Sequence, residues 1–569
     1  MDAYARLQDL LRFLYGPAQA GDIWPALRQR LEAWRPRLER WAPERPLFSQ
    51  EDAFLIAYGD HVLPPEATTP KLQGLRRFLE DHARPGVNGV HILPFFPYSS
   101  DDGFSVIDYF QVRPDLGTWD DVEAIARSFH LMVDLVLNHV SRQSPWFQAF
   151  LRDDPQYRDF FIVVDDPHDP AWAHVVRPRT TPLFTPVETS RGRRYVWTTF
   201  SPDQIDLNYH NPQVLLRMVG VLLHYIAHGA RVIRMDAVAY AWKAPYTPCI
   251  HLPQTHALVK VFRAVVDAVA PWVRIITETN VPHEENVAYF GDGTDEAHLV
   301  YNFTLPPLTL HTFLTGDASI LTRWAATLET PGPETAFFNF LASHDGIGVT
   351  PAHGWLDETQ LDLLYETTLR HGGRLSYKAL PDGGRRVYEL NITWYDALND
   401  PAQPTDLDPA RFLASQAVML TLAGVPGIYL PSLFAARNCL SCMETLGYPR
   451  AINREKFPWA KLQAMLAAPS SPHARVDQGY RRLLEWRRAL DAFHPRAPQE
   501  VLDLGPGVFA LKRTGRTSTL VALISVRDHP QRYVLPELTG VWRDVLSGES
   551  LRPAEGIPLA PYQVRWLVA

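Results

Sequence analysis

Residues 231–238 read Arg-Val-Ile-Arg-Met-Asp-Ala-Val, and the interpretation of the whole chain starts from this stretch. Its apolar residues predict a strand buried on both faces, which is typical of a parallel sheet covered by helices. Arg234 and Asp236 interrupt the apolar pattern where the strand should end. Because desolvating two opposite charges is costly, their presence indicates a functional site at the carboxyl end of this strand.

Seven other short apolar runs occur along the chain, and helical patterns such as residues 215–229 and 256–270 lie between them. Eight strands that alternate with helices predict an α/β fold, a parallel (β/α)8 TIM barrel, rather than a sandwich. The predicted strands are residues 52–60, 87–95, 130–139, 230–238, 273–279, 298–305, 335–345 and 425–432.

The spacing of the runs is uneven, and this predicts additional subdomains. Two gaps, after the third and the seventh run, are longer than a normal βαβ crossover, so each is expected to hold an insertion over the mouth of the barrel. The first fifty residues have helical periodicity, and the pattern changes to short strands near residue 500. The predicted units are a helical extension (1–50), the barrel (51–500), subdomains B (141–212) and B' (346–410), and a C-terminal antiparallel β domain (501–569).

Composition excludes several classes of protein. A formal charge of −8 gives no sign of a nucleic-acid partner, and no window is apolar enough to predict a membrane-spanning helix. Three cysteines are too few for a disulfide scaffold, and the lone pair Cys439 and Cys442 is expected to lie unbonded in a loop. These features predict a cytoplasmic protein; the oligomeric state stays open, with a homodimer as a candidate.

Polar residues stand at the carboxyl ends of five of the predicted strands. One terminal Asp often only caps the next helix, but a core gains nothing from bringing several carboxylates and imidazoles to one mouth. The convergence therefore predicts a site. Its members are Asp101, Asp102 and Asp108, the pair Asn138 and His139, the pair Arg234 and Asp236, Glu278, and the pair His344 and Asp345.

Glycoside transfer fits this set better than metal binding. A retaining glycosidase needs one carboxylate as nucleophile and a second, protonated one to release the leaving oxygen, and aromatic side chains such as Phe95 and Trp197 suit sugar rings. The histidines and aspartates of this predicted site show no H-x-x-x-H or D-x-D-x-D-G spacing. We therefore expect neither a metal nor another cofactor.

Four motifs carry a resemblance to a known family: LVLNH (135–139), RVIRMDAV (231–238), ITETN (276–280) and FLASHD (340–345). In this order, and from about residue 50 onward, the chain resembles the α-amylase clan of glycoside hydrolases. The stretches GVHILPFFPYSSDDGFSVIDY and PRAINREKF are similar to its sucrose phosphorylase-like subfamily.

The resemblance implies roles for individual residues. It makes Asp236 the nucleophile, Glu278 the general acid/base, and Asp345 the carboxylate that orients the sugar 2- and 3-hydroxyls. It also implies that Arg234 keeps Asp236 ionised and that Asp101 and Arg450 close the pocket around the glucose 4-hydroxyl. The remaining implied sugar contacts are His139 and His344 for hydroxyls, Phe104 and Phe200 as apolar walls, and Gln204.

The acceptor side is expected to be cationic, because phosphate must replace water in a phosphorylase. By resemblance, Arg179 and Tyr388 are the expected phosphate contacts. The sequence departs from sucrose phosphorylases at Asn280, Arg386 and Glu389. Gaining an arginine suits an anionic acceptor, and Arg386 is expected to bind the carboxylate of glycerate as well as phosphate.

Several stretches, including NCLSCMETLGYPRAINREKF, are similar to the glucosylglycerate phosphorylase group. This resemblance implies conversion of 2-O-α-D-glucosylglycerate and phosphate to α-D-glucose 1-phosphate and D-glycerate. Alternatives are a sucrose or glucosylglycerol phosphorylase, an α-glucoside hydrolase, and a non-catalytic barrel, which the three carboxylates disfavour.

Overall fold

The computed structural model describes residues 2–43, 48–380 and 384–569, and its centre is a closed barrel of eight parallel strands. Each of the eight predicted apolar runs contains one barrel strand, so the predicted (β/α)8 fold is confirmed. In chain order the strands are β1 (Phe54–Ala57), β3 (Gly89–Ile92), β4 (His130–Val136), β10 (Ala230–Asp236), β11 (Arg274–Thr277), β12 (Leu299–Tyr301), β13 (Ala336–Asn339) and β17 (Val425–Tyr429).

The register of β10 sets the position of the candidate nucleophile. Arg234 lies opposite Asp134 of β4 on one side and opposite Ile276 of β11 on the other. All seven residues of β10 are buried, as a strand covered on both faces should be. Asp236 is its last residue, so the strand delivers this carboxylate to the carboxyl-terminal mouth of the barrel.

Helices follow the barrel strands and cover the sheet. Their apolar faces are buried, as in α5, where Leu222 and Ile226 are fully inaccessible. The fifth covering helix, α7, is only five residues long. The main covering helices are α2 (Lys71–Phe78), α3 (Trp119–Ala126), α5 (Pro212–Ala227), α6 (Pro253–Val269), α7 (His283–Val287), α8 (Leu305–Thr315), α12 (Asp408–Thr421) and α15 (Pro472–Ala489).

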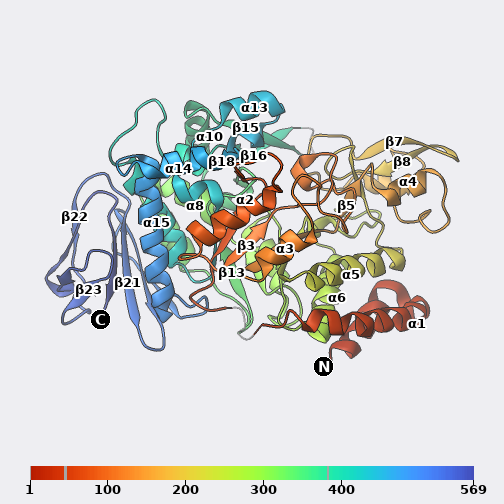
Figure 1. Cartoon of the computed structure of the whole chain (residues 1–569), viewed down its shortest axis with the longest axis horizontal. Helices are drawn as coiled ribbons and strands as arrows, with labels where there is room; N and C mark the ends of the chain where they lie inside the picture. Colours follow the sequence, from red (N-terminus) through yellow and green to blue (C-terminus); the bar gives the residue numbers. More distant parts are fainter. Residues whose placement is uncertain (1, 44–47, 381–383) are drawn as a thin grey trace.

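Two long connections, after β4 and after β13, carry small sheets of their own. The first includes the sheet β6-β8-β7 and the pair β5-β9; the second holds the sheet β14-β16-β15 and a helix. In Figure 1, β7 and β8 lie far from α10, β15 and β16. The elements are β5 (His139–Ser141), α4 (Pro145–Leu151), β6 (Val163–Val164), β7 (Phe184–Thr189), β8 (Gly192–Trp197), β9 (Gln204–Asp206), β14 (Ile347–Gly348), α10 (Glu358–Arg370), β15 (Arg374–Ala379) and β16 (Arg385–Asn391).

The two ends of the chain form separate layers on either side of the barrel. Helix α1 (Ala3–Glu39) bends at Gly16, whose φ of 75° only glycine adopts without strain, and packs against α5 and α6. The C-terminal strands form an antiparallel sheet at the opposite end of the long axis (Figure 1). This sheet has the order β19 (Gln499–Leu502), β20 (Val508–Thr514), β21 (Thr519–Ser525), β26 (Val564–Val568), β23 (Trp542–Asp544) and β24 (Ser550–Leu551).

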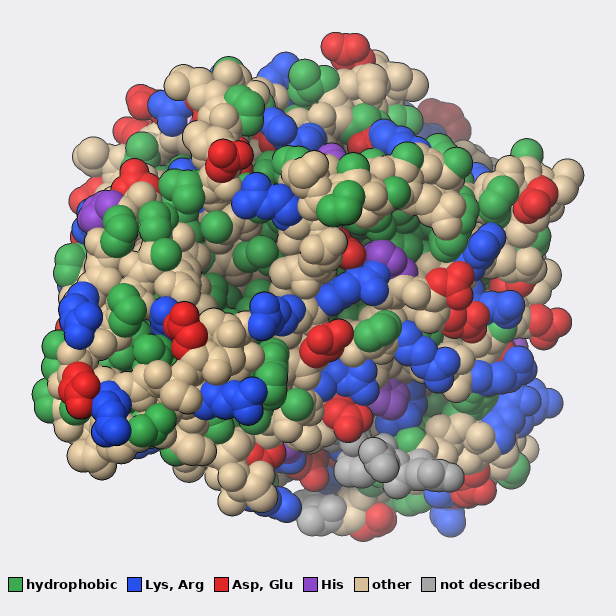
Figure 2. All heavy atoms as spheres, turned by 60° about the vertical axis from the view of Figure 1, so that its left-hand side comes forward, with side chains coloured by type: hydrophobic (Ala, Val, Ile, Leu, Met, Phe, Trp, Pro, Cys, Tyr) green, Lys and Arg blue, Asp and Glu red, His purple; other side chains and the backbone are tan. Residues whose placement is uncertain are grey.

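The surface carries charges of both signs. Figure 2 shows Lys and Arg side chains interspersed with Asp and Glu over the face it draws, which agrees with the modest net charge of −8. Within the described residues, no helix has the length and apolar character needed to cross a membrane.

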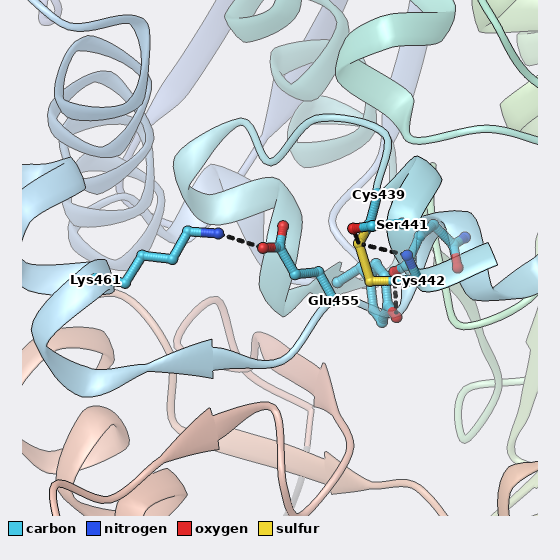
Figure 3. The surroundings of a disulfide bond; sticks show 7 residues. Cys439, Ser441, Cys442, Glu455 and Lys461 are labelled. Atoms are coloured by element: carbon cyan, nitrogen blue, oxygen red, sulfur yellow. Dashed lines mark hydrogen bonds and ion pairs between the residues drawn. A yellow bond between two sulfur atoms is a disulfide. The ribbon is translucent and has the colours of Figure 1, made fainter. Parts of the chain in front are cut away.

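Cys439 and Cys442 form a disulfide, contrary to the expectation of an unbonded loop pair. Cys439 caps the N-terminus of α13 (Leu440–Leu446), and its Sγ accepts the amide N–H of Cys442 (Figure 3). One helical turn brings two cysteines three residues apart within bonding range, with 5.2 Å between their Cα atoms. The spacing of the two cysteines alone could not predict the disulfide, because the distance between them depends on where helix α13 begins.

Arg487 of α15 ties the last barrel helix to the first barrel strand. Its guanidinium is buried and donates to the carbonyl oxygens of Gln50, Asp52 and Gly424 at 2.6, 3.0 and 3.3 Å.

We predict that Arg487→Met lowers the free energy of unfolding by about 2–3 kcal/mol, because buried carbonyls lose their donor. Thermal denaturation should show a lower midpoint for this variant. Arg482→Met, on an exposed position of the same helix, should leave the midpoint within about 1 °C of wild type.

Candidate active site

A narrow cavity at the carboxyl-terminal mouth of the barrel brings the predicted site residues together. Its lining includes the three predicted catalytic carboxylates and every predicted substrate-binding residue except Arg386. These residues come from distant parts of the chain: the segment after β3, the ends of β4, β10, β11 and β13, the two long insertions, and the segment after β17. They are Asp101, Phe104, His139, Arg179, Phe200, Gln204, Arg234, Asp236, Glu278, Asn280, His344, Asp345, Tyr388, Glu389 and Arg450.

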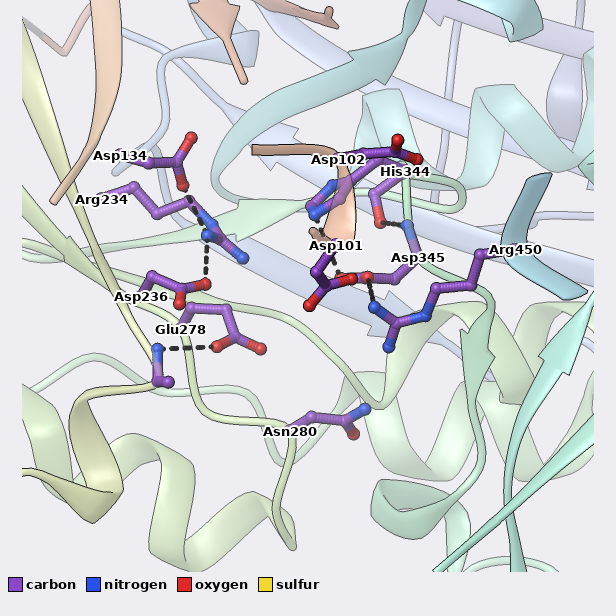
Figure 4. A network of polar contacts seen from close by, with 12 residues as sticks. Asp101, Asp102, Asp134, Arg234, Asp236, Glu278, Asn280, His344, Asp345 and Arg450 are labelled. Carbon is purple, nitrogen blue, oxygen red and sulfur yellow. Dashed lines mark hydrogen bonds and ion pairs between the residues drawn. The ribbon is translucent and has the colours of Figure 1, made fainter. Parts of the chain in front are cut away.

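Arg234 joins two carboxylates at the floor of this cavity. Its Nη1 donates to Asp134 Oδ1 at 2.5 Å and to Asp236 Oδ1 at 2.8 Å (Figure 4). Asp134 also contacts His91 Nε2 at 2.7 Å. All four side chains of this network are buried. The contacts restrict the rotation of Arg234 and hold the Asp236 carboxylate in one orientation.

Asp236 and Glu278 lie side by side and share one electrostatic environment (Figure 4). Burial raises the pKa of Asp236 to about 8, Arg234 opposes this rise, and the nearby Glu278 adds to it. Burial also raises the pKa of Glu278, with Arg234 lowering it and Asp345 raising it. The pair therefore retains a proton near neutral pH. Because Asp236 accepts the charge-assisted hydrogen bond from Arg234, we place the negative charge on Asp236 and the proton on Glu278.

The third carboxylate, Asp345, is in a different state. Burial raises its pKa, but Arg450, His344 and Arg454 outweigh burial and hold the pKa well below its usual range. Arg450 Nη1 lies 2.6 Å from Asp345 Oδ1, and its Nε and Nη2 donate to the Glu389 carboxylate at 3.0 and 2.9 Å. Asp345 is thus a fixed anion across the pH range in which the Asp236 and Glu278 pair titrates.

Asp101 borders the cavity from a strained loop. Both Asp101 and Asp102 have left-handed backbone conformations, with φ of 54° and 46°. Arg454 and Tyr448 hold the Asp102 carboxylate from one side. From the other side, Asp203 Oδ2 accepts hydrogen bonds from three hydroxyls, those of Ser99, Ser100 and Ser105. Asp101 itself accepts from Gln204 Nε2 at 3.3 Å, and no direct pair between Asp101 and Arg450 is formed among the described contacts.

Rings and polar groups form the walls around these carboxylates. Phe104 stacks on His344 with 4.9 Å between ring centroids. His139 Nε2 lies 3.0 Å from the Phe104 carbonyl oxygen and 3.2 Å from Gln204 Nε2. Phe200 lies against His139 at 5.3 Å. This combination of stacked rings and hydroxyl-binding groups suits one sugar ring.

The outer side of the cavity is formed by Arg179, Asn280 and Tyr388. The Arg179 guanidinium lies between the rings of Phe200 and Tyr388, at 5.8 and 5.6 Å from their centroids, and no described carboxylate pairs with it. Asn280 Nδ2 donates to the Tyr388 hydroxyl at 3.2 Å, while its Oδ1 is buried and has no hydrogen-bond partner among the described residues. The outer side of the cavity therefore carries a cation, Arg179, that no described carboxylate neutralises.

Arg386 is the predicted substrate-binding residue that the structure does not bring to the cavity, and Asp102, Asp108 and Asn138, which were expected at the same mouth, do not line it either. It is exposed on β16 opposite Lys378 of β15. Successive side chains of a strand point to opposite faces, so its neighbour Arg385 has the other orientation. Arg386 therefore does not reach the cavity, where its predicted contact with glycerate or phosphate would have to be made.

Comparison with known proteins agrees with this geometry. The family described as "Alpha amylase, catalytic domain" matches residues 66–346. A glucosylglycerate phosphorylase of Spirochaeta thermophila is 47% identical over 100% of this chain and 99% of its own, and one of Allomeiothermus silvanus is 48% identical over 98% and 97%. The chain belongs to the α-amylase family, among its glycoside phosphorylases.

A solved structure of the family supports the fold. The crystal structure of sucrose 6F-phosphate phosphorylase from Thermoanaerobacter thermosaccharolyticum has a TM-score of 0.73 and 26% sequence identity, over 84% of this chain and 94% of that one. The α-amylase family resemblance inferred from the four motifs is confirmed.

Sequence reasoning missed several residues that support this α-amylase family site. Asp134 and His91 fix Arg234, while Asp203 and Arg454 anchor the loop of Asp101. Two signals were visible: Asp134 begins the segment DLVLNH just before the LVLNH motif, and Asp203 directly precedes Gln204. Nothing in the spacing showed which charges would pair.

We predict that Asp134→Asn shifts the acidic limb of the pH profile of kcat/KM to lower pH. The negative charge of Asp134 raises the pKa of Asp236, so removing it makes Asp236 easier to ionise. Activity at the optimum should fall by roughly tenfold because Arg234 loses a partner. Asp544→Asn removes a buried, Arg565-paired carboxylate of the C-terminal sheet and should leave the limb in place. A shift to higher pH in Asp134→Asn would contradict the assignment.

Proposed function

We propose that this protein is a retaining glucosylglycerate phosphorylase. It would convert 2-O-α-D-glucosylglycerate and phosphate to α-D-glucose 1-phosphate and D-glycerate by double displacement. The observation that carries the proposal is that Arg179, which no described carboxylate neutralises, lines the same cavity as Asp236, Glu278 and Asp345. Full-length identity of 47–48% to proteins of that name supports the choice of acceptor.

In the first step, the Asp236 carboxylate attacks the anomeric carbon of the bound glucosyl unit. The bond from that carbon to the glycerate oxygen breaks, and Glu278 donates its proton to this oxygen. The glucosyl unit is then held as a β-linked ester on Asp236. Arg234 keeps the attacking carboxylate aligned, and the fixed anion Asp345 favours the positive charge that develops on the sugar ring.

In the second step, an oxygen of phosphate attacks the same carbon from the face that glycerate left. The ester bond to Asp236 breaks, and Glu278, now a carboxylate, takes the proton of the attacking phosphate oxygen. Two inversions return the α configuration. Arg179 is the cation that brings phosphate to this position, and Phe200 and Tyr388 hold its guanidinium from either side.

Arg179 would also bind the carboxylate of glycerate. Glycerate and phosphate occupy the outer side of the cavity in turn, so one guanidinium serves both anions. Asn280 lines the same cavity beside Tyr388. Glu389 contributes indirectly, because its carboxylate is taken up by Arg450, which in turn contacts Asp345.

The surroundings of the enzyme are part of the proposal. Its small reactants, a sugar acid and inorganic phosphate, are consistent with the cytoplasm expected from the sequence. A homodimer is the candidate assembly, and light scattering of the purified chain would measure it.

We predict that the enzyme prefers D-glycerate as acceptor when it runs in reverse from α-D-glucose 1-phosphate. Its kcat/KM should exceed those for glycerol and fructose by at least about tenfold, since a carboxylate gains a charge-assisted hydrogen bond that neutral acceptors lack. Phosphate release measures all three reactions. Preference for fructose or glycerol would favour a sucrose or glucosylglycerol phosphorylase, and glucose as the main product in the presence of phosphate would indicate a hydrolase.

Glu278→Gln and Asp236→Asn should separate the two catalytic roles. With glucosylglycerate, Glu278→Gln should lose roughly 10²–10⁴-fold in kcat, because the leaving oxygen needs a proton. With α-D-glucosyl fluoride, whose leaving group needs little protonation, the first step of this variant should retain most of its rate in a fluoride-release burst. Asp236→Asn should be inactive on both donors. Equal losses of Glu278→Gln on the two donors would contradict the acid role.

A further inference from the structure

A second, larger hollow adjoins the catalytic cavity on its outer side. Its volume is about 580 Å³, against about 90 Å³ for the cavity itself. We call it the outer hollow and define it by the residues that it does not share with the cavity, chiefly Ser100, Thr180, Ser376, Tyr377, Arg385 and Tyr448. Both spaces share a wall that includes Arg179, Phe200 and Glu389, so a small solute in the hollow lies next to the reacting centre.

Arg385 faces the outer hollow from β16, the strand that also carries Tyr388. Arg385 lines the hollow and not the cavity, Tyr388 lines the cavity and not the hollow, and Glu389 lines both. The Arg385 guanidinium lies 5.0 Å from the ring centroid of Tyr377 on β15. This contact orients an exposed cation without neutralising it.

Arg385 and Arg179 stand out because no described carboxylate pairs with either of them. Other cations of the site are neutralised: Arg234 by Asp134 and Asp236, and Arg450 by Asp345 and Glu389. Of the two carboxylates that line the hollow, Glu389 is paired with Arg450, whereas Asp101 accepts only from the neutral amide of Gln204. Two guanidiniums without a described carboxylate partner thus outnumber one carboxylate without a described cationic partner, and the hollow favours an anion.

We propose that the outer hollow is a loading site for a small oxyanion, which Arg385 and Arg179 hold before it enters the cavity. This inference rests on the proposed phosphorolysis, and it adds a binding site and a residue, Arg385, to that reaction. The ligand we propose is inorganic phosphate. The carboxylate of glycerate is also a small oxyanion that a guanidinium binds, and KM measurements in the two reaction directions distinguish it from phosphate.

The test measures how fast phosphate captures the glucosyl enzyme. With α-D-glucosyl fluoride as donor and inorganic phosphate as acceptor, Arg385→Ala should raise the KM for phosphate by roughly five- to twentyfold and change kcat by less than twofold. Arg385→Lys, which keeps the charge but loses the planar fork, should recover part of this difference. Raising the salt concentration should increase the KM of wild type more steeply than that of Arg385→Ala.

Arg193→Ala is the matched control. Arg193 is likewise an exposed arginine of an inserted sheet, with its guanidinium 5.7 Å from the ring centroid of Tyr195, but it lines neither the cavity nor the outer hollow. Its loss changes the net charge by the same amount. The KM for phosphate should stay within twofold of wild type, which separates a local site from a general effect of charge.

The reverse reaction identifies the ligand. From α-D-glucose 1-phosphate, the KM values of Arg385→Ala for D-glycerate and for neutral glycerol are compared with those of wild type. If Arg385→Ala raises the KM for phosphate alone, the hollow is assigned to phosphate. If it raises the KM for glycerate as well, the hollow is assigned to both oxyanions. An unchanged KM for phosphate and glycerate, or an equal rise for glycerol, would overturn the inference. If the wild-type enzyme forms no α-D-glucose 1-phosphate when phosphate is added, the proposed phosphorolysis itself is refuted.

Discussion

The active site depends on one buried interaction, the bridge that Arg234 forms between Asp134 and Asp236. An arginine and two carboxylates in the interior of a barrel cost several kcal/mol of desolvation, which their mutual contacts must offset. The parallel register of β4 and β10 makes this arrangement available, because it places Asp134 directly opposite Arg234. The proposed nucleophile, Asp236, is thereby held by the barrel itself.

The loops around this fixed centre are held by charges from different parts of the chain. The strained segment of Asp101 and Asp102 is anchored by Asp203 from the insertion after β4 and by Arg454 from the segment after β17. Strained backbone persists only where its surroundings over-determine it. The wall beside Asp101 is therefore assembled before a sugar arrives, which reduces the ordering cost of binding.

Phosphorolysis requires an anion to approach a centre that already contains three carboxylates. The structure separates these charges. Arg234 pairs with Asp236 and Arg450 with Asp345, while Arg179, on the outer side, has no carboxylate partner among the described residues. An incoming phosphate thus meets free positive charge before it meets the acidic centre, and this arrangement favours phosphate over water as the second reactant.

The sequence by itself determined the barrel, the family and the grouping of the cavity residues. Strands buried on both faces are nearly continuous apolar runs, so polar residues such as Asp236 and Glu278 are visible at their ends, and parallel strands bring those ends to one mouth. Tertiary structure alone decided which charges pair and which stay free. It gave Arg450 two carboxylate partners, bonded Cys439 to Cys442, and turned Arg385 rather than Arg386 toward the site. These outcomes depend on the face from which a side chain emerges and on segments far apart in sequence, neither of which is encoded in local spacing.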